Sequence, residues 1–222
     1  VDGHVVEAIL SHEPRTPAGA ALERTRALTE RLGIRRDRLN SYPHQLSGGM
    51  RQRVMISLGL VLNAELVVAD EATTSLDVIV EANLLDQLRE LRDEYGMSIL
   101  AITHNIALVA ELADRIAVMY AGRMAEVGSV YDVFDNPLHP YTRGLLRSVP
   151  NIRLDDTEEL YKMPGEPPNL TYPPTGCRFH PRCPRAMAIC AERQPPMAAG
   201  DGAGRLVQCW LYAEPDAGEV QP

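Results

Sequence analysis

Two adjacent carboxylates, Asp70 and Glu71, stand at the end of a short apolar run from Leu66 to Ala69. The run is too short for a helix, and an uninterrupted apolar stretch of this length is typical of a parallel strand buried on both faces. Further apolar runs, Ser98 to Thr103 and Arg115 to Tyr120, follow with room for helices between them. This alternation predicts an α/β fold with a parallel sheet.

Helical spacing marks the segments around these runs. Apolar residues at three- and four-residue intervals predict helices that begin near Thr16 and at Ser47, a longer helix that Gly96 ends, and a short helix from Asn105 to Ala113. Ala121-Gly122 is expected to turn the third strand into an extended segment. Residues 1–45 contain only helix and turn patterns.

The composition of the sequence changes after Val149, in a segment that is rich in proline and contains all four cysteines. Because proline cannot donate a backbone hydrogen bond, neither long helices nor central strands are expected there. We expect residues 149–213 to form a small loop-rich extension that needs a staple, and residues 214–222 to be disordered.

Composition excludes several classes of protein. A net charge of −8 argues against a nucleic-acid binder with a basic face. No stretch reaches the roughly 20 apolar residues that span a bilayer, and no signal peptide is visible. Four cysteines without an export signal are not expected to form structural disulfides, so we expect a cytoplasmic location. The chain begins with Val1 rather than Met, which suggests a fragment.

The string Leu46-Ser47-Gly48-Gly49-Met50-Arg51-Gln52-Arg53 places two glycines at the start of a predicted helix. Free backbone N–H groups and the helix dipole favour an anion at that position, and glycine lets a ligand approach the backbone closely. The simpler interpretation is that Ser47 caps the helix and the glycines form a turn.

The carboxylates Asp70 and Glu71 lie where α/β sheets bind ligands, at the carboxyl end of a strand. One can reach a phosphate-bound magnesium ion through water, and the next can polarise an attacking water. A solvated strand end is the simpler interpretation. His104 directly follows the second strand, and adjacent strands would bring it to the same sheet edge as Glu71. An isolated histidine, however, is most often structural or merely exposed.

Taken together, these strings resemble the ABC ATPase family. The first string resembles its signature motif, Asp70-Glu71 its Walker B strand, and His104 its switch histidine. Ser75-Leu76-Asp77 resembles the D-loop, which includes Ser75 and Asp77. The resemblance implies a partial P-loop NTPase core with a helical subdomain.

The resemblance also implies that the protein binds ATP and Mg²⁺. It makes Glu71 and His104 catalytic residues and Asp70 the magnesium residue. Signature contacts to an ATP molecule held by another subunit are implied for Ser47, Gly48, Gly49 and Gln52. The 222 residues contain no Gly-x-x-x-x-Gly-Lys-Ser/Thr string, and Lys162 is their only lysine. We therefore expect the P-loop to lie upstream of Val1, and this chain alone to be inactive as an ATPase.

Two further strings, Asn136-Pro137-Leu138-His139-Pro140-Tyr141-Thr142 and Gly176-Cys177-Arg178-Phe179-His180-Pro181-Arg182-Cys183-Pro184, are similar to the C-terminal extension of oligopeptide/dipeptide/nickel transporter ATPases. The cysteine spacing lacks the tight pairs of structural zinc sites and is compatible with an iron–sulfur cluster. The resemblance favours a [4Fe–4S] cluster; zinc and unligated thiols stay open. The ligands would be Cys177, Cys183, Cys190 and Cys209.

The sequence thus predicts three parts and a tail: residues 1–45 in a helical subdomain, 46–148 in the nucleotide-binding core, 149–213 in the extension and 214–222 beyond it. The resemblance implies an ATP-hydrolysing subunit of an oligopeptide or dipeptide importer. Its partners would be a second ATPase subunit, two membrane permeases and an extracytoplasmic peptide-binding protein, with no nucleic acid. It would lie peripherally on the cytoplasmic face of the inner membrane.

Several alternatives differ in testable features. A DNA-repair ATPase would carry a long coiled coil, and a translation factor of this family would carry two signatures; neither feature is present. The remaining alternative is a truncated remnant that acts only as a metal-binding or interaction module.

Overall fold

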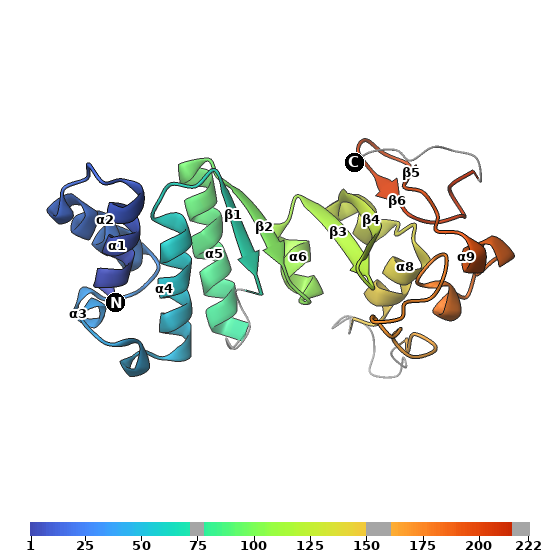
Figure 1. The fold of residues 1–222 in the computed structure, drawn as a ribbon, viewed down its shortest axis with the longest axis horizontal. Coiled ribbons are helices and arrows are strands. Elements are labelled where there is room, and N and C mark those ends of the chain that lie inside the picture. The colour runs from blue at the N-terminus through green and yellow to red at the C-terminus, as the bar shows by residue number, and fades with distance from the viewer. Residues whose placement is uncertain (72–77, 150–160, 215–222) are drawn as a thin grey trace. The chain divides into compact units, whose positions relative to one another are not determined.

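The structure is a computed structural model that describes residues 1–71, 78–149 and 161–214. The chain divides into two compact units, Val1–His104 and Asn105–Pro222 (Figure 1). Each is considered by itself.

Unit 1 is a parallel strand pair with helices. The strands β1 (Leu66–Asp70) and β2 (Ser98–Ile102) run parallel, in register from Leu66 opposite Ser98 to Asp70 opposite Ile102. Its helices are α1 (Asp2–His12), α2 (Ala18–Arg31), α3 (Arg36–Leu39), the 3-10 turn η1 (Pro43–Gln45), α4 (Gly48–Leu60) and α5 (Val78–Tyr95). Helix α5 connects the two strands, which is the strand–helix–strand order that the sequence predicts.

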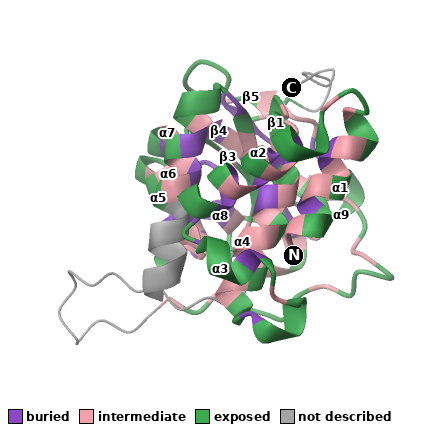
Figure 2. Ribbon diagram, turned by 90° about the vertical axis from the view of Figure 1, so that its left-hand side faces the viewer, coloured by how far each residue is buried: buried purple, intermediate pink, exposed green. Residues whose placement is uncertain are grey.

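The core of unit 1 forms where these helices meet. Val5 and Ile9 on α1 are fully buried and belong to one apolar cluster with residues of α2, α4 and α5. Figure 2 shows the buried residues of the chain in purple. Burying a side chain of this size stabilises the fold by about 1.5–3 kcal/mol. Helix α2 ends as expected, because Gly33 adopts a φ of 74° that a residue with a β-carbon rarely takes.

The expectation that both strands are buried on both faces is wrong for this structure. Val67 and Ile99 pack against the core, but the alternate residues are half exposed: Leu66 by 55%, Val68 by 57% and Leu100 by 52%. Successive side chains of a strand point to opposite faces, so the helices of unit 1 cover only one face of β1 and β2.

Unit 2 is built on an antiparallel sheet with the strand order β3-β4-β6-β5. The strands are β3 (Arg115–Tyr120), β4 (Arg123–Ser129), β5 (Ala198–Ala199) and β6 (Leu206–Val207). The helical elements are α6 (Ile106–Leu112), α7 (Val130–Asp135), α8 (Pro140–Arg147), η2 (His180–Arg182) and α9 (Ala188–Glu192). Ala121 and Gly122 both have positive φ, 49° and 74°, and form the turn that the sequence predicts after β3. The expectation that Arg115–Tyr120 joins a parallel sheet is wrong for this structure, because this turn pairs β3 antiparallel with β4.

The expectation that the segment beyond Val149 contributes no central strand is also wrong. Strand β6 lies between β4 and β5, with Glu126 opposite Val207 and Val127 opposite Leu206. The physical reason is local, because Leu206 and Val207 follow the proline-rich stretch and are free to donate backbone hydrogen bonds. The cysteine-containing segment is therefore part of the sheet of unit 2.

None of the helices in the described part of the chain combines the length and apolar character that crossing a bilayer requires.

Candidate functional site

The structure brings Glu71 and His104 together at the carboxyl ends of β1 and β2. The His104 Nδ1 atom lies 3.4 Å from the Glu71 Oε1 atom, and both side chains are largely exposed. The backbone N–H of Glu71 donates to the carbonyl of Ile102 over 2.9 Å, which ties the end of β1 to β2. Asp70, the last residue of β1, is exposed beside them. A carboxylate pair and an imidazole are thus accessible at one edge.

Glu71 itself has an unusual backbone conformation. Its φ is 46°, in the left-handed region that residues other than glycine rarely occupy. Such conformations cost about 1–3 kcal/mol and concentrate at functional sites. This carboxylate is therefore held at the end of β1 at some cost in backbone energy.

The signature string forms the amino end of α4. The Ser47 hydroxyl accepts a hydrogen bond from the Met50 N–H over 3.3 Å and so caps the helix, and Arg51 donates to the carbonyl of Leu46 over 2.9 Å. A β-carbon added to Gly48 would meet no atom within 4 Å. Internal packing of the described residues therefore does not require glycine there, whereas close approach of a ligand would.

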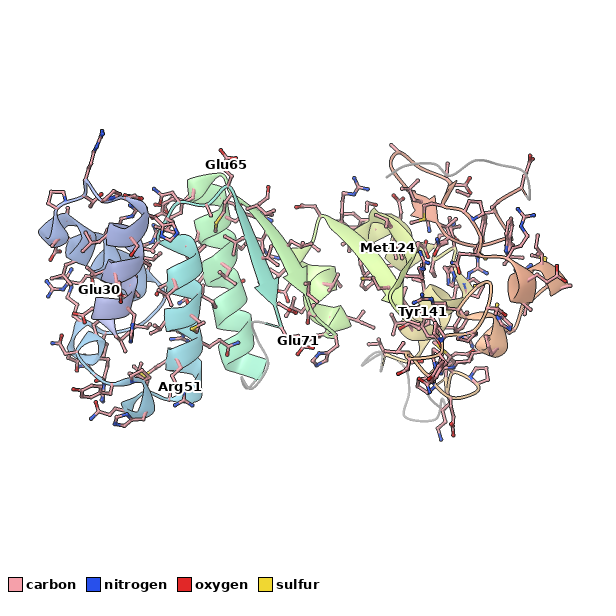
Figure 3. All side chains as sticks on the ribbon, in the orientation of Figure 1. Glu30, Arg51, Glu65, Glu71, Met124 and Tyr141 are labelled. Carbon is pink, nitrogen blue, oxygen red and sulfur yellow. The ribbon has the colours of Figure 1, made fainter. Side chains whose placement is uncertain are left out.

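The helix end and the carboxylates lie at the same end of unit 1. Figure 3 shows Arg51, in the first turn of α4, and Glu71 at this end, with Glu65 at the opposite end of β1. Gln52 is half buried one residue further along α4. The D-loop residues Ser75 and Asp77 lie outside the described residues.

The four cysteines gather in unit 2, and all are free thiols. Burial raises the pKa of the Cys209 thiol to about 11, and the neighbouring thiols of Cys177, Cys183 and Cys190 also raise it. Burial is likewise the main cause of the raised pKa values of Cys177 and Cys183. Cys190 and Cys209 are buried and Cys177 and Cys183 are half-buried, and the four thiols, here called the four-cysteine site, lie near enough to influence the Cys209 thiol.

One sulfur of this site accepts a backbone hydrogen bond. The Met187 N–H donates to the Cys190 sulfur over 3.4 Å. Among the described residues, no three or more His, Cys, Asp or Glu side chains lie close enough to hold a metal ion. His180, which is half-buried, directs its Nδ1 atom at the Cys177 carbonyl over 2.9 Å.

Sequence reasoning missed the buried polar groups beside this site. Glu126 and Arg205 form a fully buried ion pair, and His139 is 4% exposed. The only feature of the sequence that hints at this ion pair is the charged residue Glu126 in the middle of strand β4. Arg205 is separated from Glu126 by 79 residues, a distance over which a single sequence reveals no pairing.

His139 makes the stability of unit 2 sensitive to acid. Burial lowers its pKa from 6.5 to about 4, although the nearby Glu126 carboxylate opposes the shift. Between these values the unfolded chain binds a proton that the folded chain does not, so stability falls as the pH falls from 6.5 to 4. The loss amounts to about 3 kcal/mol at pH 4.

Replacing His139 by glutamine is expected to remove most of this acid sensitivity. Glutamine does not titrate, and its amide oxygen can still accept the Tyr141 N–H that the His139 Nδ1 atom accepts over 3.0 Å. Urea midpoints of unit 2 at pH 7 and pH 4.5 measure the effect, with exposed His4→Gln as the control. An equal acid-induced loss in wild type and His139→Gln would contradict the assignment.

Comparison with known proteins decides the family. Residues 5–74 match the family described as "ABC transporter", and residues 125–190 match "Oligopeptide/dipeptide transporter, C-terminal region". The chain is 43% identical to the oligopeptide transport ATP-binding protein OppD of Bacillus subtilis, over all of this chain and 62% of that protein. It is 45% identical to OppD of Salmonella typhimurium, over 96% of this chain and 63% of that protein. The chain belongs to the oligopeptide/dipeptide family of ABC transporter ATP-binding proteins.

Solved structures agree with this family. A dimeric ABC transporter cassette, MJ0796, is 26% identical with a TM-score of 0.51, covering 56% of this chain and 54% of the cassette. The cassette cbiO1 of Clostridium perfringens is 28% identical with a TM-score of 0.52, covering 58% of this chain and 51% of the cassette. The family assignment confirms the expected ABC ATPase fold class. This chain spans 53% to 63% of the length of the transporter relatives that it matches.

Proposed function

We propose that this member of the oligopeptide/dipeptide ABC family works as an ATP-hydrolysing subunit that powers peptide import. The observation that carries the proposal is the placement of Glu71 and His104, 3.4 Å apart, at the end of unit 1 that also holds the capped start of α4. Residues 1–45 serve as the helical subdomain, 46–148 as the nucleotide-binding core and 149–213 as the extension of this subunit.

Each group at this edge has a part in hydrolysis. Asp70 holds the magnesium ion through water, and the ion neutralises phosphate charge when it is bound. Glu71 orients the attacking water and accepts its proton, while His104 contacts the terminal phosphate. The D-loop residues Ser75 and Asp77 belong to the same proposed site.

The signature residues act on a nucleotide held by a partner subunit. Ser47, Gly48, Gly49 and Gln52 present backbone N–H groups and side-chain donors at the positive end of α4. The open space around Gly48 leaves room for a phosphate. Because the 222 residues include no phosphate-binding Gly-x-x-x-x-Gly-Lys-Ser/Thr string, other protein segments must cradle the ATP.

The working assembly is a heterodimer of two such ATPases beneath two permease subunits, fed by an extracytoplasmic peptide-binding protein. The subunit lies peripherally on the cytoplasmic face of the inner membrane. Relatives named as oligopeptide and dipeptide transport ATP-binding proteins support peptides as the substrate. Affinity purification of the full-length subunit from native membranes tests the proposal. A second ATPase and two permeases should co-purify, and recovery of the subunit alone would count against it.

We further propose that the four-cysteine site holds a [4Fe–4S] cluster through Cys177, Cys183, Cys190 and Cys209. The proposal rests on four free thiols in one extension and on the Met187 N–H that the Cys190 sulfur accepts over 3.4 Å, the kind of hydrogen bond that tunes iron–sulfur clusters. Binding of a cluster would draw the sulfurs closer together than they lie among the described residues. Burial disfavours free thiolates at this site, so a bound cation would compensate the charge. The cluster would supply a structural staple for the extension.

Protein purified without oxygen is expected to contain about four iron and four acid-labile sulfide per chain. Cys→Ser at any of the four positions should abolish the visible absorption and make residues of the extension more sensitive to protease, while unit 1 stays folded. Iron and sulfide analysis, with limited proteolysis, measures both effects. One zinc per chain without labile sulfide would rule out the cluster.

A further inference from the structure

Glu126 and Arg205 are the most deeply buried charged residues in the described part of unit 2. The Arg205 Nη2 atom donates to the Glu126 Oε1 atom over 2.8 Å, and their side chains are 2% and 0% exposed. A buried ion pair often adds little net stability, because both charges lose their hydration. We therefore expect this ion pair to hold the segments around it in one particular arrangement.

Glu126 connects three separate segments. Besides Arg205, its carboxylate accepts the backbone N–H groups of Leu138, over 2.9 and 3.2 Å, and of His139, over 2.9 Å. Arg205 also donates to the carbonyl of Asn136. One side chain on β4 thus fixes both the turn before α8 and the residue before β6.

The contacts of Glu126 with Arg205 and with Leu138 both bear on the position of Cys209. Along the chain, Arg205 precedes β6, and the Gln208 N–H then donates to the Ala125 carbonyl over 2.9 Å, so the backbone before Cys209 is held against β4. Through side chains, Leu138 packs in one apolar cluster with Cys209, Val207 and the partly buried Leu211.

The other cysteines are held by different contacts. In the loop from Cys177 to Cys183, Arg178 donates to the Ala121 carbonyl and Arg182 donates to the Tyr120 hydroxyl over 3.3 Å. Phe179 packs edge-on against Tyr120 with ring centroids 5.1 Å apart. The Cys177 N–H donates to the Cys190 carbonyl over 2.8 Å. None of these contacts involves Glu126 or Arg205.

We propose that Glu126 is the positioning residue for Cys209, and that its ion pair with Arg205 fixes the place of this thiol in unit 2. The inference rests on the four-cysteine site described above and concerns the placement of a thiol. It does not depend on which metal the site takes.

Site-resolved thiol labelling tests this role. The full-length subunit is stripped of metal without oxygen and treated with a small alkylating reagent, and the rate at each cysteine is followed by mass spectrometry. Glu126→Gln should raise the labelling rate of Cys209 at least about tenfold and leave Cys177 and Cys183 within about twofold of wild type. Glu192→Gln, which removes an exposed carboxylate in α9, should change none of the rates. Equal rates at Cys209 in Glu126→Gln and wild type, or parallel increases at all four cysteines, would overturn the proposal.

Arg205→Lys covers the case in which Glu126→Gln does not fold. Lysine keeps the charge but lacks the planar guanidinium, whose Nη2 atom donates to both the Glu126 carboxylate and the Asn136 carbonyl, and its ammonium stands on a flexible chain. Labelling of Cys209 should rise by a smaller factor than in Glu126→Gln, again with Cys177 and Cys183 unchanged. A rate at Cys209 equal to that of wild type would also overturn the proposal.

Reconstitution with iron and sulfide separates this proposal from that of the cluster. If wild type forms a cluster, the Glu126→Gln protein should show an altered absorption and electron paramagnetic resonance spectrum, as expected when one thiolate is displaced. If wild type forms no cluster, the labelling result still decides the role of Glu126, and only the metal assignment fails.

Discussion

ATP turnover by the assembled, full-length transporter is expected to fall by roughly 10²-fold or more when Glu71 is replaced by glutamine. Glutamine keeps the size of the side chain and a hydrogen-bonding oxygen, but it cannot accept a proton from the attacking water. The substitution would also remove the negative charge that lies 3.4 Å from the His104 Nδ1 atom. ATP binding should be retained, so nucleotide affinity and steady-state hydrolysis are measured on the same preparation.

Glu65 offers a matched control for this substitution. It is an exposed glutamate at the opposite end of β1 (Figure 3), and Glu65→Gln removes the same charge away from the edge that holds His104. We expect turnover within about twofold of wild type for Glu65→Gln. Near-normal turnover in Glu71→Gln would show that Glu71 is not the base.

The second large effect is expected at Ser47. Aspartate caps a helix as well as serine does and interacts favourably with the helix dipole, so Ser47→Asp should leave α4 intact. Its negative charge would face the phosphates of the ATP held by the partner subunit. We expect hydrolysis to fall by roughly 10²-fold, since a few kcal/mol of repulsion across the interface is enough to oppose closure.

Ser47→Asn separates charge from capping. Asparagine has nearly the shape of aspartate and caps equally well, but it is neutral. Turnover of Ser47→Asn should stay within about tenfold of wild type, and thermal melting of both variants should match wild type. If the aspartate and asparagine variants lose activity equally, phosphate repulsion is not the cause.

Local patterns predicted the parts of the fold that depend on local physics. The capping of α4 by Ser47, the stop at Gly33 and the turn at Ala121-Gly122 each depend on a few neighbouring residues. The meeting of Glu71 and His104 was also predictable, because parallel strands joined by a helix bring their carboxyl ends to one edge.

What the sequence did not reveal depends on partners far along the chain. The apolar runs in β1 and β2 suggest burial on both faces, yet Val68 and Leu100 are half exposed, since exposure depends on which elements lie over each face. Strand β6 has two residues, too few for any periodicity. The Glu126–Arg205 pair joins β4 to a segment beyond the cysteines, and a charged residue alone does not indicate its partner.

The most direct measurement of the central proposal is ATP-driven uptake by the full transporter in proteoliposomes. The full-length subunit is reconstituted with its partner ATPase, permeases and binding protein, and accumulation of a mixture of dipeptides and oligopeptides is followed by mass spectrometry. We predict accumulation that requires ATP and Mg²⁺ and is lost in Glu71→Gln but not in Glu65→Gln. ATP hydrolysis without peptide accumulation, or peptide uptake that Glu71→Gln leaves unchanged, would contradict the account.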